Sequence, residues 1–139
     1  MHLSNPLENR LGYHLRRAAS AMLAHLSEGL GDLGLRYTEA SVLLMIEANP
    51  GLKQRDIGQV LGIKSANMAP LIGVLSKRNY IERKPLDGRS QGLYLSEQGK
   101  RVMVDIWQCV EGNEAWLLSE VSDSERKMVM RYLQSVWES

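Results

Sequence analysis

The side chains best suited to chemistry in this 139-residue chain are cations and amides, and they concentrate in its middle. Residues 53–101 hold ten Lys and Arg against four Asp and Glu, a formal charge of +6. The rest holds seven basic and twelve acidic residues, a charge of −5, and the two parts give the net charge of +1. Guanidinium and ammonium groups bind phosphate oxygens, so this polarity predicts a polyanion along the central part and protein or solvent along the flanks.

Other kinds of chemistry have little support. The sequence has no Gly-rich phosphate loop and no nucleophile elbow, and His14 and His25 stand eleven residues apart without further ligands at metal-binding spacing. The single cysteine, Cys109, excludes an internal disulfide and has no cationic neighbour in sequence to activate it, so we interpret it as a packing residue. We therefore expect no enzymatic activity, no cofactor and no metal site.

Two short helices joined by a turn are predicted between Gln54 and Gly73. Gly58 has no Cβ where the second helix must cross the first closely, and Gly62 can adopt the positive φ of the turn. A packed helical hairpin in any small α domain shares such apolar spacing, but glycines at these offsets favour a helix-turn-helix. The apolar residues at helical spacing are Ile57, Leu61, Met68, Leu71, Ile72 and Leu75.

The start of the second helix is polar. Lys64, Ser65 and Asn67 stand where a helix-turn-helix presents side chains to base edges in the major groove. If Ser65 caps this helix, Pro70 falls just beyond the first turn and removes one backbone hydrogen bond, which implies a mild kink or a later start. Pro70 and the neighbouring alanines reduce the direct readout of bases, so we expect binding to depend more on the polar start, the next hairpin and phosphate contacts.

Two strand-like runs follow, Ile81–Lys84 and Gly92–Leu95, with the turn-forming segment Pro85–Ser90 between them. A helix-turn-helix with such a hairpin attached is a winged helix. Taken alone, the sequence Asp87-Gly88-Arg89 would indicate an ordinary solvated turn. Here it lies at the basic tip of a predicted wing.

The wing sequence resembles that of the MarR (multiple antibiotic resistance regulator) family. The resemblance is carried by Asp87-Gly88-Arg89, then Leu93-Tyr94-Leu95-Ser96 and Gly99, and it spans most of the chain. It implies that Arg89 enters the minor groove and that Asp87 holds it, and a guanidinium on a thin hairpin suits a narrow, strongly negative groove. The predicted DNA-binding residues are Lys53, Gln54, Lys64, Ser65, Ala66, Asn67, Lys77, Arg83, Asp87, Arg89 and Ser90.

Long amphipathic helices are expected on both sides of this lobe. An apolar stripe runs from Leu7 to Leu30, Thr38 reads as the cap of a second helix, and Ser96 and Ser122 open two C-terminal helices. We predict a mainly α (α+β) fold in a single MarR-like domain, 1–139. It comprises a winged helix-turn-helix lobe, 38–95, and dimerisation helices, 7–30 and 97–138.

These helices are predicted to join two copies of the chain. Trp107, Trp116 and Trp137 together suggest a homodimer interface, although each alone fits a monomer core. A two-fold axis would place the two recognition helices about one DNA turn, roughly 34 Å, apart.

The resemblance further implies a cleft between the dimerisation helices and the DNA-binding lobe, where many family members accept a small effector. The candidate lining residues are Tyr13, His14, Arg17 and Tyr37, for each of which surface or core packing is the simpler reading.

The sequence thus predicts a DNA-binding transcriptional regulator. We expect a homodimeric repressor that binds a pseudo-palindromic site on double-stranded DNA and is released by a small aromatic or acidic ligand. The alternative is a winged-helix module for protein–protein contact. No apolar run approaches the length of a membrane span and the N-terminus does not resemble a signal peptide, so we expect a cytoplasmic protein without a membrane partner.

Overall fold

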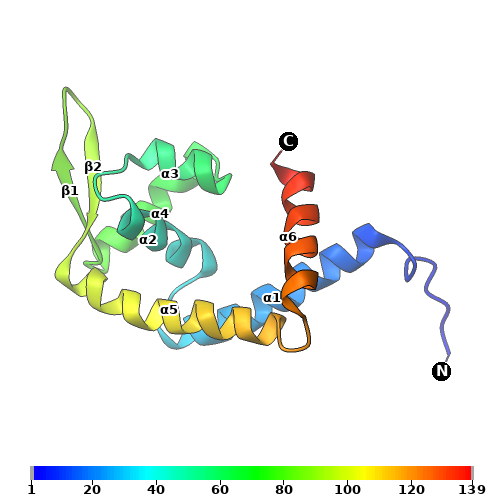
Figure 1. Ribbon diagram of the computed structural model, residues 1–139. Coiled ribbons are helices and arrows are strands. Elements are labelled where there is room, and N and C mark those ends of the chain that lie inside the picture. The colour runs from blue at the N-terminus through cyan, green and yellow to red at the C-terminus, as the bar shows by residue number, and fades with distance from the viewer. Residues whose placement is uncertain (1, 139) are drawn as a thin grey trace.

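The computed structural model describes residues 2–138. The predicted domain, 1–139, therefore lies within the description except for residues 1 and 139. The fold is mainly helical with a two-stranded antiparallel wing, as predicted. The elements, shown in Figure 1, are α1 (Leu11–Asp32), α2 (Tyr37–Ala48), α3 (Gln54–Leu61), α4 (Ser65–Lys77), β1 (Ile81–Pro85), β2 (Gln91–Leu95), α5 (Glu97–Leu117) and α6 (Asp123–Trp137).

The arrangement separates a lobe from an arm (Figure 1). Helices α2, α3 and α4 and the β1–β2 hairpin form the lobe. Helices α1, α5 and α6 form the arm, in which α1 and α5 pack against each other beneath the lobe and α6 projects from the end of α5. Helix α2 is the centre of the core, because it contacts α1, α3, α4, α5 and β2. Its side chains Val42, Leu43 and Ile46 are almost completely buried.

Two predicted helix starts were wrong. The helix expected from Leu7 begins at Leu11, because the preceding residues form turns in which the backbone N–H of Glu8 donates to the carbonyl of Asn5. Thr38 is not the cap of α2. Arg36 is the N-cap in extended backbone, and its N–H donates to Oε1 of Glu39 over 2.8 Å.

The helix-turn-helix corner is confirmed. Gly62 ends α3 with φ of 69°, and a Cβ on Gly58 would lie 3.0 Å from both the carbonyl oxygen of Ile63 and Cγ of Met68. The cap of α4 is Lys64 rather than Ser65, and α4 continues through Pro70 without the later start that the sequence suggested.

The end of α4 is tied to the end of α1 by one side chain. Nη1 of Arg78 donates to the carbonyl of Gly34, and Nη2 donates to the carbonyl of Leu33 over 3.1 Å. The guanidinium also lies 5.0 Å from the ring centre of Tyr80, a cation–π distance. Because the donor is charged and the acceptors are backbone groups, these bonds hold two segments that are far apart in sequence in a fixed relation.

Hydrogen bonds of Ser96 hold the base of the wing against the start of α5. Ser96, a buried N-cap of α5, accepts from the N–H of Gly99 over 2.9 Å, and its hydroxyl donates to the carbonyl of Asn79 over 2.6 Å. A Cβ on Gly99 would lie 2.1 Å from the carbonyl oxygen of Tyr80. The Ser and Gly of the predicted signature therefore have a structural role, since they set the start of α5 against the start of β1.

No helix within residues 2–138 is long and apolar enough to cross a membrane.

Replacing Gly99 by Ala should destabilise the fold by about 1–3 kcal/mol or more, because the added methyl meets a backbone carbonyl that cannot rotate away. Gly112→Ala in the same helix is the matched control. No heavy atom lies within 4 Å of its added Cβ, so it should raise stability by about 0.5–1 kcal/mol. Urea unfolding at one chain concentration measures both, and equal midpoints for the two variants would contradict this packing.

Candidate nucleic-acid interface

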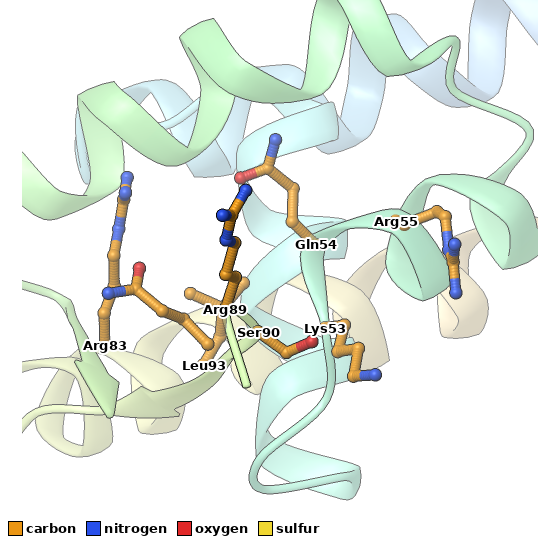
Figure 2. Close-up of a pocket in the computed structure, with 8 residues that line it drawn as sticks. Lys53, Gln54, Arg55, Arg83, Arg89, Ser90 and Leu93 are labelled. Carbon is orange, nitrogen blue, oxygen red and sulfur yellow. The ribbon is translucent and has the colours of Figure 1, made fainter. Parts of the chain in front are cut away.

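A cationic cleft of about 330 Å³ lies between the first turn of α3 and the wing (Figure 2). Figure 2 shows Arg83, Arg89 and Gln54 extending into the same space from three different segments. The cleft is lined by Lys53, Gln54, Arg55, Arg83, Arg89, Ser90, Gln91 and Leu93. It therefore gathers five of the predicted DNA-binding residues and adds Arg55, which the sequence reasoning counted as basic but did not assign to the site.

Strand pairing explains why these side chains meet. Arg83 pairs with Leu93, and directly paired residues of an antiparallel ladder share a face. Leu93 also forms a bridge with Leu52, just before α3, and its carbonyl accepts from the N–H of Gly51 over 2.8 Å. The face of the wing that carries Arg83 is thus held beside Lys53 and Gln54.

The opposite face of the wing differs. Lys84 alternates with Arg83 along β1, and its ammonium lies 4.7 Å from the ring centre of Tyr94. That face borders a separate cavity, which contains Glu82 and Glu97 as well as Lys84. Two adjacent cations of one strand therefore have different surroundings, one cationic and one of mixed charge.

The cations of the cleft have no carboxylate partner. Among the described residues, the one ion pair within 4.0 Å joins Lys100 and Glu97, both exposed and on α5. Lys53, Arg55, Arg83 and Arg89 consequently present their charge to whatever enters the cleft. Such a cluster repels itself and is stabilised by a bound polyanion.

Asp87 does not hold Arg89 in the way that the resemblance implied. Both side chains are exposed at the wing tip, and no ion pair joins them in the described chain. The backbone carbonyl of Asp87 instead accepts from the N–H of Ser90 over 3.4 Å, in a turn where Gly88 has φ of 67°. The backbone of Asp87 therefore takes part in the turn, and Arg89 extends toward the cleft without an ion pair to the Asp87 carboxylate.

The predicted residues of α4 lie beside the cleft and point to solvent. Lys64, Ser65, Ala66, Asn67 and Lys77 are all exposed. Lys64 and Asn67 line an open groove of about 560 Å³ between α4 and the start of α2, whereas Ser65 borders a hollow shared with α3. The start of α4 is thus accessible along its whole width.

The predicted effector residues are distributed differently. The hydroxyl of Tyr13 accepts from Nδ2 of Asn5 over 3.1 Å, and Nε2 of His14 donates to the carbonyl of Glu8 over 2.6 Å. Arg17 and Tyr37 are exposed. None of the four lines any of the five cavities described for residues 2–138.

The remaining reactive groups are engaged in packing. The ring of His25 stacks on that of Trp116 at 4.2 Å, and its Nδ1 accepts from the buried amide of Asn113 over 2.9 Å.

Burial, and then the charges of Asp105 and Asp32, raise the pKa of the Cys109 thiol above its ordinary value. A raised pKa lowers the fraction of reactive thiolate, which agrees with the interpretation of Cys109 as a packing residue. The described residues contain no group of three or more His, Cys, Asp or Glu that could hold a metal.

Comparison with known proteins agrees with this geometry. Residues 33–90, from the end of α1 to the wing tip, match the model of the MarR family. The transcriptional repressor CouR, bound to a 23-mer DNA duplex, superposes with a TM-score of 0.89 at 27% identity, covering 98% of this chain and 99% of that one. Residues 33–90 thus form a MarR-family winged helix-turn-helix, and the whole chain has the fold of MarR-family transcriptional regulators.

Two further comparisons extend this result. HTH-type transcriptional regulator SarZ of Staphylococcus epidermidis is 29% identical over 116 residues, which is 79% of this chain and 78% of SarZ. A structure of CouR bound to p-coumaroyl-CoA superposes with a TM-score of 0.86 at 25% identity, covering 97% of each chain. The winged helix-turn-helix and the long flanking helices are therefore shared with proteins that are transcriptional regulators.

The two faces of the wing provide a direct test of the cleft. Arg83→Ala should weaken binding to double-stranded DNA and lower the slope of log K against log[salt] by about 1, because one phosphate contact is lost. Lys84→Ala is the matched control, since it removes the same charge from the adjacent residue on the other face. Fluorescence anisotropy with one duplex at several salt concentrations measures both, and equal losses would show that net charge rather than the cleft determines binding.

Proposed function

We propose that this MarR-family protein is a homodimeric repressor that binds a pseudo-palindromic operator. The observation that carries the proposal is the unpaired cation cluster of the cleft beside the solvent-exposed start of α4. The solvent-exposed start of α4 can enter the major groove, and the thin wing beside it can reach the adjacent minor groove. Arg89 is the wing cation in this proposal, whereas Lys53, Arg55 and Arg83 neutralise phosphates.

The exposed apolar surface of the arm supports the homodimer. None of the described residues of α6 is buried, although the helix carries Met128, Val129, Tyr132, Val136 and Trp137. The side chain of Trp137 is 69% exposed. A continuous apolar surface of this kind on one helix marks a protein contact, and a second copy supplies a complementary one through two-fold symmetry.

The three tryptophans do not contribute equally. Nε1 of Trp107 donates to Oε1 of Glu47 over 2.8 Å, and Trp116 stacks on His25, so both have partners within their own chain. Trp137 is the tryptophan that the proposed interface needs. We therefore assign dimerisation to 7–30 and 97–138, with α6 as its main element, and DNA binding to 38–95.

Two copies joined in this way would meet one duplex together. Half-sites one helical turn apart are separated by about 10–10.5 base pairs, or roughly 34 Å. The 23-mer with which CouR was solved spans about two turns, enough for two such half-sites.

We place the effector at Tyr13, His14, Arg17 and Tyr37, with a small aromatic or acidic molecule as its ligand. None of these residues lines one of the five cavities described above, and in this proposal the second copy completes the site. The p-coumaroyl-CoA held by CouR is both aromatic and acidic, which supports this class of ligand.

Binding is tested by titrating the protein against duplex fragments from beside its own gene at two salt concentrations. We expect a dissociation constant of nanomolar order on one fragment and a steep loss of affinity with salt. Arg89→Ala should weaken binding by about 1–3 kcal/mol and leave the dimer intact. Absence of specific binding on every fragment would favour the alternative, a winged-helix module for protein–protein contact.

The dimer is tested by ending the chain after Ser122. Loss of α6 removes the exposed apolar helix, so the shortened chain should sediment as a monomer and lose DNA affinity at the same time. Gln134→Ala, a change at an exposed polar position of α6, is the control and should leave the dimer unchanged. A shortened chain that still sediments as a dimer would refute the interface.

A further inference from the structure

The outward face of α4 is apolar, which is unexpected for a helix that approaches DNA. Met68, Ile72 and Leu75 are almost completely buried and define its inner face. The opposite stripe follows the spacing i, i+4, i+7 and i+11. It consists of Ala66, Pro70, Gly73 and Lys77, all exposed.

This stripe offers almost no hydrogen-bonding side chains. From Ala69 to Leu75 no side chain of the helix carries a donor or an acceptor. Apart from Ser76 and Lys77 in the last turn, polar readout by α4 is thus confined to its start, at Lys64, Ser65 and Asn67. Recognition of base edges further along the helix has to use apolar contact.

Two residues of the stripe have features that the fold does not require. A Cβ on Gly73 would meet no heavy atom within 4 Å, so packing within the chain does not demand glycine there. Pro70 has no N–H for the carbonyl of Ala66, and an interior proline destabilises a helix. Both residues lie on the surface. The small size of Gly73 and the missing N–H of Pro70 therefore matter for a binding partner rather than for packing within the chain.

The major groove contains one apolar group that such a surface can recognise, the C5-methyl of thymine. We propose that the Ala66–Pro70–Gly73 stripe reads thymine methyl groups, with Ala66 and Pro70 in contact and Gly73 allowing the close approach of the DNA. This inference rests on the proposed function. Lys64 and Lys77 at the two ends of the stripe, and the cations of the cleft beside it, favour a nucleic acid over an apolar protein as its occupant.

The geometry limits how many thymines are read. Ala66 and Pro70 are four residues apart, about 6 Å along the helix axis, which corresponds to about two base-pair steps of 3.4 Å. Each half-site should therefore contain two thymines, on either strand, whose methyl groups contribute to affinity.

The test starts from a library of random 30-base-pair duplexes, from which the full-length protein selects its site. Each thymine of the selected duplex is then replaced by uracil, which removes only the methyl group. We expect affinity to fall about three- to tenfold at two positions in each half-site and to stay unchanged elsewhere. A selected duplex whose affinity is indifferent to uracil at every position would overturn this inference while leaving DNA binding intact.

Two variants connect the loss to the stripe. Pro70→Ala removes the ring carbons beyond Cβ and restores a helix N–H, and Ala66→Gly removes one methyl. Each should reduce the penalty of uracil at one position to less than about twofold, because the partner of that thymine methyl is gone. Arg89→Ala is the control and should weaken binding to the thymine and uracil duplexes equally.

If neither stripe variant changes the uracil penalties, the methyl groups are read elsewhere and the assignment to the stripe is overturned. A library that yields no bound duplex would overturn the proposed function, and this inference with it.

Discussion

The position of α4 depends on the guanidinium of Arg78. It joins the end of α4 to the carbonyls of Leu33 and Gly34, at the end of α1, and lies against Tyr80 at the start of the wing. Charged donors on backbone acceptors are among the stronger hydrogen bonds of proteins. One side chain thus relates three elements, and it fixes the direction of α4 relative to the end of α1 and the start of the wing.

In the function that we propose, affinity and specificity are divided between different parts of this surface. The unpaired cations of the cleft would attract any duplex, because phosphates carry no sequence information. The exposed face of α4 carries little charge between Lys64 and Lys77, and we propose that its shape and apolar character distinguish one base pair from another. Under this proposal a cationic cleft without the helix would bind without preference, and an apolar helix without the cleft would bind too weakly.

Local patterns were sufficient to predict the lobe. The apolar spacing, the positive φ of Gly62 and the close crossing at Gly58 follow from covalent geometry, and the wing strands matched to within one residue at the tip. The caps of α2 and α4 were misplaced because Arg36 and Lys64 make no side-chain capping hydrogen bond and are not among the residue types that mark an N-cap in a sequence. The position of Arg55 in the cleft and the different surroundings of Arg83 and Lys84 could not be predicted from local patterns. They depend on the bridge between Leu52 and Leu93, two residues that are distant in sequence.

In the function that we propose, two copies place two α4 helices on one face of a single duplex. Hydroxyl-radical footprinting of the selected duplex, with the number of bound chains measured by mass, tests this arrangement most directly. We predict two protected tracts whose centres are about 10–10.5 base pairs apart, with two chains per duplex. A single protected tract, or one chain per duplex, would contradict it.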